Sequence, residues 1–169
     1  MSRVCAALSL LLPLAGACGS AATTVFTDGG QAPPAHGTYT LVFPAVSVAV
    51  YAQTVQVFVF PAADAVSQCR ELITAQPLGT LPSPAVASES LPICDLVPDG
   101  GAGSLAIGFG SYAVLVVAQN GGADVAIGCA EQTVTAEAPN VTVTLEQTVV
   151  PPPTTCTTLS ASCAGECAN

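Results

Sequence analysis

Hydrophobic and polar residues alternate along several stretches after residue 37, which is the pattern of half-buried β-strands. In residues 38–43, Tyr39, Leu41 and Phe43 fall on one side. Residues 46–60 (VSVAVYAQTVQVFVF) contain two such stretches, and residues 140–146 (NVTVTLE) alternate without a break. The β-branched residues Val and Thr are frequent in all of them, so we predict strands there.

The middle of the chain predicts further strands and one strong turn. Residues 112–118 (YAVLVVA) form a near-continuous apolar run, which suits a central strand covered on both faces. The sequence Asn120-Gly121-Gly122 follows, and these residue types tolerate the positive φ of a tight hairpin. The chain is therefore expected to return through residues 124–130. Weaker strand patterns lie at 84–89, 91–96 and 103–109.

Residues 63–76 (ADAVSQCRELITAQ) break the two-residue period. Val66, Cys69, Leu72 and Ile73 recur at the spacing of one helix face. Asp64 stands where its side chain can cap the first turn. We therefore predict one short helix at 64–76, packed on a sheet by that face.

These elements predict an all-β fold: an antiparallel β-sandwich of about seven strands over residues 38–149, with one short helix. Residues 18–37 are rich in Gly, Ser, Thr and Pro and lack an apolar period, so we expect a flexible N-terminal tether. Residues 150–169 form a C-terminal tail that begins with three prolines, which favour an extended polyproline II segment, and ends in three cysteines.

The first 17 residues have the order of a secretory signal peptide. Arg3 supplies the positive charge, residues 4–12 (VCAALSLLL) are apolar, and small residues precede Cys18. The apolar stretch is shorter than the roughly 20 residues that a helix needs to span a bilayer. We therefore predict a cleaved leader rather than a permanent membrane helix.

The segment Leu14-Ala15-Gly16-Ala17-Cys18 resembles the lipobox of bacterial lipoproteins. The resemblance implies cleavage between Ala17 and Cys18, a diacylglyceryl group on the Cys18 thiol, and a further acyl chain, such as palmitate, on its amine. Such chains would anchor the protein to a membrane of the cell envelope, the outer membrane in a Gram-negative cell, because Gly19 follows the cysteine. Ala15 stands where Leu is commonest, which puts the efficiency of processing in question. The alternative is an ordinary signal peptide that leaves Cys18 as an odd thiol.

A second resemblance covers residues 108–129 (GFGSYAVLVVAQNGGADVAIGC), which look like one hairpin of transthyretin-like or carboxypeptidase-regulatory-like sandwiches. This resemblance implies a seven-stranded sandwich used for display or support, with no catalytic residues to carry over.

Six cysteines beyond Cys18 form an even set, which together with an export signal predicts disulfides: Cys69, Cys94, Cys129, Cys156, Cys163 and Cys167. Six cysteines allow 15 pairings. We expect a bridge between Cys69 and Cys94, a local bridge between two tail cysteines, and a bridge from the third to Cys129. Zinc is a weaker alternative, because the tail spacing is not C-x2-C and the tail has no His. We predict no metal and no cofactor.

Charge narrows the possible partners. The chain has a formal net charge of −9, contains no Lys, and its two basic residues are Arg3 and Arg70. Removal of the leader would leave Arg70 alone. Binding to nucleic acid or to anionic headgroups depends on clustered Lys and Arg. We therefore predict neither mode of binding, and expect membrane contact through the lipid anchor alone.

Candidate catalytic residues are scattered. The carboxylates follow no paired pattern, and the only histidine, His36, lies in the tether, where we expect it to be exposed. We predict a non-catalytic sandwich that has a structural role or binds a partner through sheet edges or loops. The alternative is a module that binds a small ligand in an apolar cleft between the sheets, and a hydrolase is the least favoured function.

Overall fold

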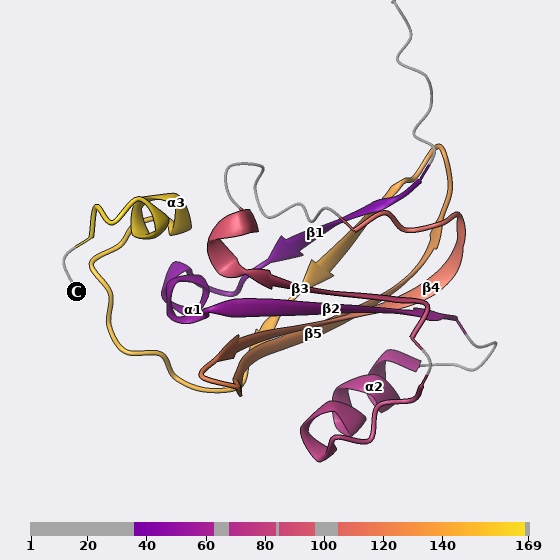
Figure 1. Ribbon diagram of the computed structural model, residues 1–169, viewed down its shortest axis with the longest axis horizontal. Coiled ribbons are helices and arrows are strands. Elements are labelled where there is room, and N and C mark those ends of the chain that lie inside the picture. The colour runs from indigo at the N-terminus through magenta and orange to yellow at the C-terminus, as the bar shows by residue number, and fades with distance from the viewer. Residues whose placement is uncertain (1–35, 63–67, 84, 97–104, 168–169) are drawn as a thin grey trace, which may run out of the picture. The chain divides into compact units, whose positions relative to one another are not determined.

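The strands of the computed structural model form two sheets (Figure 1). The structure describes residues 36–62, 68–83, 85–96 and 105–167, which fall within one compact unit, Pro33–Asn169. The strands are β1 (Thr38–Val42), β2 (Thr54–Pro61), β3 (Ala87–Pro92), β4 (Gly110–Asn120), β5 (Ala123–Val134), β6 (Asn140–Thr144) and β7 (Glu146–Gln147). The helices are α1 (Val46–Tyr51), α2 (Gln68–Ala75) and α3 (Leu159–Cys163), with short 3₁₀ helices η2 (Gln76–Leu78) and η3 (Ile93–Leu96).

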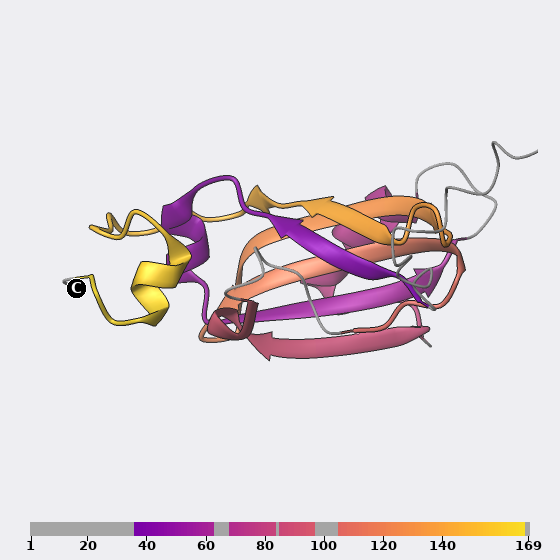
Figure 2. The same cartoon turned by 90° about the horizontal axis from the view of Figure 1, so that it is seen from above.

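The larger sheet is antiparallel, with the strand order β3-β2-β4-β5-β7, and the smaller sheet pairs β1 with β6. The two sheets lie face to face (Figure 2), so the predicted all-β sandwich is confirmed. One pairing differs from the prediction, because β1 and β6 run parallel. A short hairpin forces its two strands to be antiparallel, but β1 and β6 come from opposite ends of the domain and no turn fixes their relative direction.

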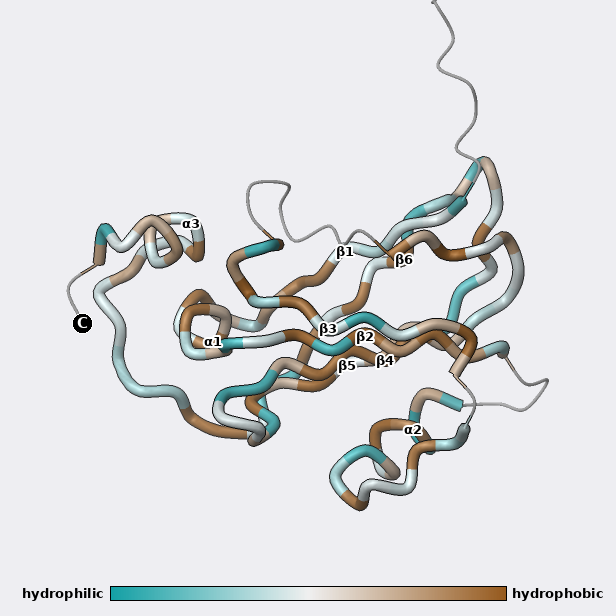
Figure 3. The backbone as a smooth tube through the Cα atoms, viewed as in Figure 1, coloured by the Kyte–Doolittle hydropathy of each residue, from teal (hydrophilic) through white to brown (hydrophobic). Residues whose placement is uncertain are grey.

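The core lies between the sheets. Tyr39 and Leu41 of β1 and Val141 and Val143 of β6 are at most 5% exposed, so the predicted alternation of these strands is confirmed. They belong to one cluster with the inward side chains of the larger sheet: Val55, Val57, Val59, Val114, Val116, Ala118 and Ala126. Figure 3 shows hydrophobic residues along the central strands. Full burial of one such Val stabilises the fold by roughly 1.5–3 kcal/mol.

The opposite, outer face of the larger sheet is covered by α2. Leu72 of α2 packs in a second cluster with Phe60 of β2 and with the outward side chains of β4: Ala113, Leu115 and Val117. β4 is thus buried on both faces, as its apolar run predicted. The predicted helix is confirmed over Gln68–Ala75, while Asp64 and Val66 lie outside the described residues. Ile73 is 37% exposed, so the predicted packing face is wrong at this residue, because the helix contacts the sheet along a narrow line through Cys69 and Leu72.

Residues 46–51, predicted as a strand, form α1 instead. Val48 and Ala49 of this helix are buried. Here the chain leaves the smaller sheet after β1 and enters the larger sheet at β2. A straight strand cannot make this change of layer within a few residues, so the path of the chain overrides the β-propensity of Val.

Three further boundaries differ from the predictions. β3 overlaps the end of the predicted strand 84–89 and the start of the predicted strand 91–96. Residues 93–96 form η3 instead of a strand, and Ile93 and Leu96 are buried three residues apart, the period of a 3₁₀ helix. In the described part of 103–109, a single bridge joins Ile107 to Gly37, in place of the predicted strand.

The predicted hairpin at residues 120–122 is confirmed, since Gly121 and Gly122 have φ of 57° and 84° between β4 and β5.

Candidate functional site

The six cysteines form three disulfides: Cys69–Cys129, Cys94–Cys163 and Cys156–Cys167. The predicted disulfide framework is confirmed, and so is the local bridge between two tail cysteines. The predicted Cys69–Cys94 bridge and the predicted bridge from the tail to Cys129 are wrong. Cys129 is paired across the sheet with Leu115, on the outer face that α2 covers, so it meets Cys69 of that helix. Cys94 lies in η3, which contacts α3 and therefore meets Cys163.

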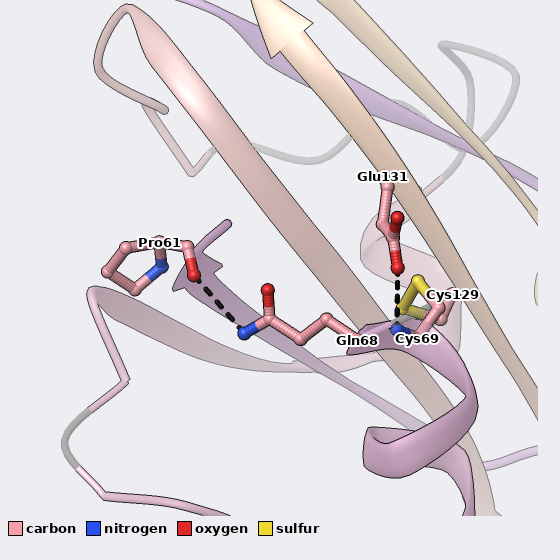
Figure 4. The surroundings of a disulfide bond; sticks show 5 residues. All are labelled: Pro61, Gln68, Cys69, Cys129 and Glu131. Carbon is pink, nitrogen blue, oxygen red and sulfur yellow. Dashed lines mark hydrogen bonds between the residues drawn. A yellow bond between two sulfur atoms is a disulfide. The ribbon is translucent and has the colours of Figure 1, made fainter. Parts of the chain in front are cut away.

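Glu131 helps to fasten α2 to the sheet (Figure 4). One carboxylate oxygen of Glu131 accepts the backbone N–H of Cys69 at 2.7 Å, and the side-chain amide of Gln68 donates to the carbonyl of Pro61 at 3.1 Å. The first N–H groups of a helix lack partners within the helix, so Glu131 satisfies one of them. Glu131 follows Cys129 by two residues, so the two side chains lie on the same face of β5. This spacing in the sequence could have placed Glu131 beside the disulfide.

The C-terminal tail is folded against the domain. The Thr158 hydroxyl caps α3 by accepting the backbone N–H of Ala161 at 3.1 Å. Leu159 packs against the main core, and α3 contacts both α1 and η3. The Cys94–Cys163 disulfide and this packing therefore hold the tail at the end of the sandwich where α1 lies, while Cys156–Cys167 closes a loop within the tail.

Tyr39 and Glu89 connect the two sheets. The Tyr39 hydroxyl of β1 donates to Glu89 Oε2 of β3 at 2.7 Å, and Tyr39 is fully buried. Burial first, and then the hydrogen bond to Glu89 and its negative charge, raise the pKa of Tyr39 well above its usual value of 10. Tyr39 thus stays protonated and acts as a hydrogen-bond donor, not as a base.

The other candidate residues for chemistry have structural or solvent contacts. Asp124 Oδ1 accepts from the side-chain amide of Gln119 at 2.8 Å across the β4–β5 hairpin, and His36 is exposed, as predicted. Within the described ranges, no group of three His, Cys, Asp or Glu side chains could hold a metal ion. The absence of a metal and of catalysis stays a prediction.

The described residues border at least two open hollows on the surface, outside the core. One, of about 150 Å³, is bordered by α1 and the proline segment of the tail: Ser47, Val50, Tyr51, Pro152, Pro153 and Thr154. The other, of about 240 Å³, lies where β2 meets β3: Gln56, Phe58, Ser88, Glu89 and Ser90. The second hollow combines an aromatic ring, hydroxyls and the border strand of the larger sheet, and it is our candidate interaction site. No motif in the sequence marks these residues as a site.

The residues of the proposed anchor, Ala17 and Cys18, lie outside the described part of the chain. In the ranges that the structure describes, no helix has the length and apolar character needed to cross a bilayer. Three disulfides are typical of proteins in an oxidising, extracytoplasmic compartment.

Comparisons of the chain with protein-family models, with curated proteins and with solved structures found no match. Both resemblances noted in the sequence therefore stay predictions.

Proposed function

We propose that this protein is a lipoprotein of the cell envelope, anchored through acyl chains on Cys18, whose sandwich binds a protein partner without catalysing a reaction. In a Gram-negative cell the membrane would be the outer membrane. The observation that carries the proposal is the complete pairing of the six cysteines of the domain with one another. No member of this set is left over to bridge Cys18, so its thiol is available for lipidation.

The energetics of anchoring support a permanent attachment. Each buried methylene of an acyl chain contributes about 0.8 kcal/mol, and stable attachment takes two membrane signals. A diacylglyceryl group with a further acyl chain exceeds that requirement. The chain has only two basic residues, so the proposed attachment depends on the acyl chains rather than on electrostatic attraction to anionic headgroups.

Metabolic labelling with radioactive palmitate tests the anchor. Label is expected on the full chain and on a Cys5→Ala variant, which changes the other cysteine of the leader, but not on Cys18→Ala. The Cys18→Ala protein is also expected in the soluble fraction. Label that persists on Cys18→Ala would overturn the anchor.

Cross-linking followed by purification from detergent-solubilised membranes tests the binding function. A stoichiometric protein partner is the expected result. A bound small molecule in its place would favour a ligand-binding module, and turnover on a panel of hydrolase substrates would favour an enzyme.

A further inference from the structure

β3 forms one border of the larger sheet (Figure 2), and among the described residues it pairs with β2 alone. Antiparallel strands exchange backbone hydrogen bonds at every second residue pair. The backbone N–H of Ile93 donates to the carbonyl of Gln53 at 2.9 Å, in the same register as the strand pairs, so the bonded residues of β3 are Ala87, Glu89 and Leu91. The backbone groups of Ser88 and Ser90 therefore point away from β2, toward the side of β3 on which no described strand lies.

Pro92 belongs to the same outward set as Ser88 and Ser90. Because proline has no N–H, it would cost a hydrogen bond at an inward position but costs none here. It also ends the part of the edge that can donate to another strand. The edge that can both donate and accept is thus short, limited to the N–H and C=O groups of Ser88 and Ser90, and backbone pairing needs support from side-chain contacts.

The 240 Å³ hollow offers such support next to this edge. Ser88 is paired with Phe58, and Ser90 with Gln56, across the β2–β3 ladder. The two serines are exposed and short, so they leave space between the edge and the partly buried ring of Phe58. A strand added to β3 would place alternate side chains over these serines, and only a long side chain there would reach the ring.

Charge selects the kind of side chain. The chain has eleven acidic residues, no Lys, and no basic residue beyond the leader other than Arg70. A second copy would bring the same excess of negative charge, whereas a cationic partner is attracted. Arg and Lys combine a long apolar stem with a charge that interacts favourably with an aromatic face.

We propose that the outer edge of β3 binds an extended segment of a protein partner, and that an Arg or Lys of this segment lies over Ser88 in the hollow against Phe58. The inference rests on the proposed partner-binding function and names its site. It corresponds to strand addition, in which backbone hydrogen bonds supply affinity and alternate side chains supply specificity.

The test uses the oxidised protein and the peptide Thr-Val-Arg-Val-Arg-Val-Thr-amide, with fluorescein attached to its N-terminal amine, and binding is followed by fluorescence anisotropy. Ser90→Pro removes an outward N–H and is expected to weaken binding about tenfold, which corresponds to 1.4 kcal/mol. Ser90→Thr keeps the N–H and is the matched control, expected to bind like the original protein. A peptide with Glu in place of Arg is expected to bind at least tenfold more weakly. The Phe58→Leu variant is expected to bind the Arg peptide more weakly than the original protein does, by less than tenfold.

A second measurement covers the case that Ser90→Pro fails to fold. Two versions of the Arg peptide carry methyl groups on alternate backbone nitrogens: one on the nitrogens that would face β3, the other on the nitrogens that would face away from it. Only the first version is expected to lose binding. Equal loss or equal retention in both versions would overturn strand addition. Failure of the Arg peptide to bind, or equal binding of the Glu peptide, would overturn the proposed cationic segment. A cross-linked partner that still binds Ser90→Pro would reject this edge while leaving the proposed function intact.

Discussion

The backbone carbonyl of Thr144 lies against Gly128, in the space that a Cβ at this position would occupy. Thr144 ends β6 in the smaller sheet, and the chain then steps through the buried Leu145 to β7 in the larger sheet. The missing side chain of Gly128 lets this corner close onto β5. One small residue thus allows the chain to pass from one layer of the sandwich to the other.

We expect Gly128→Ala to destabilise the fold by about 3 kcal/mol, because the added methyl group meets backbone that cannot move aside easily. Urea unfolding followed by circular dichroism measures the loss. Gly121→Ala is the control, since a Cβ there meets open space and the left-handed backbone alone costs about 1 kcal/mol. An equal loss in the two variants would show that the corner tolerates a side chain.

Stability at high pH is expected to depend on Tyr39. Its pKa is raised in the folded state, so its contribution is fully present below the unfolded value of 10 and is lost as the pH rises above it. The free energy of unfolding should fall above pH 10 with a component of roughly 1.4 kcal/mol per pH unit. Tyr39→Phe lacks this component. Urea titrations of both proteins between pH 8 and about 11 test it, and identical slopes would contradict it.

The bridges should differ in their contribution to stability. In the chain-entropy model, Cys69–Cys129, with a separation of 60 residues, contributes about 4 kcal/mol, and Cys156–Cys167, with a separation of 11, about 3 kcal/mol. Replacing each pair by serines and comparing the urea midpoints measures both. The variant without Cys69–Cys129 also frees α2 from the larger sheet, so the outer face of this sheet should become exposed and bind a hydrophobic dye. A first variant more stable than the second would contradict this order.

The Cys94–Cys163 bridge should be reduced first. Cys94 is exposed, whereas Cys69 and Cys129 are partly buried and Cys156 is 8% exposed. A thiol must reach a sulfur atom to open a disulfide, so access sets the rate in folded protein. Brief treatment with dithiothreitol, alkylation and peptide mass spectrometry should find the first label on Cys94 and Cys163. The Cys94→Ser, Cys163→Ser double variant should lack this early phase, and early label on Cys69 or Cys156 in the original protein would contradict the order.

The sequence by itself determined the class of fold, because the residue patterns that favour strands and hairpins span only a few neighbouring residues. The alternation of β6, the apolar run of β4 and the glycines at 121 and 122 each act within a few residues. The even set of cysteines likewise indicated disulfides before any pairing was known.

Only the tertiary structure decided which distant segments meet. The parallel pairing of β1 with β6, the helix at Val46–Tyr51, the partners of Cys69 and Cys94, and the contact of Tyr39 with Glu89 all join residues far apart or depend on a change of layer. Burial of the two sheet faces selects these arrangements for the chain as a whole. No local pattern encodes them, because the stabilising contacts exist only once both layers are assembled.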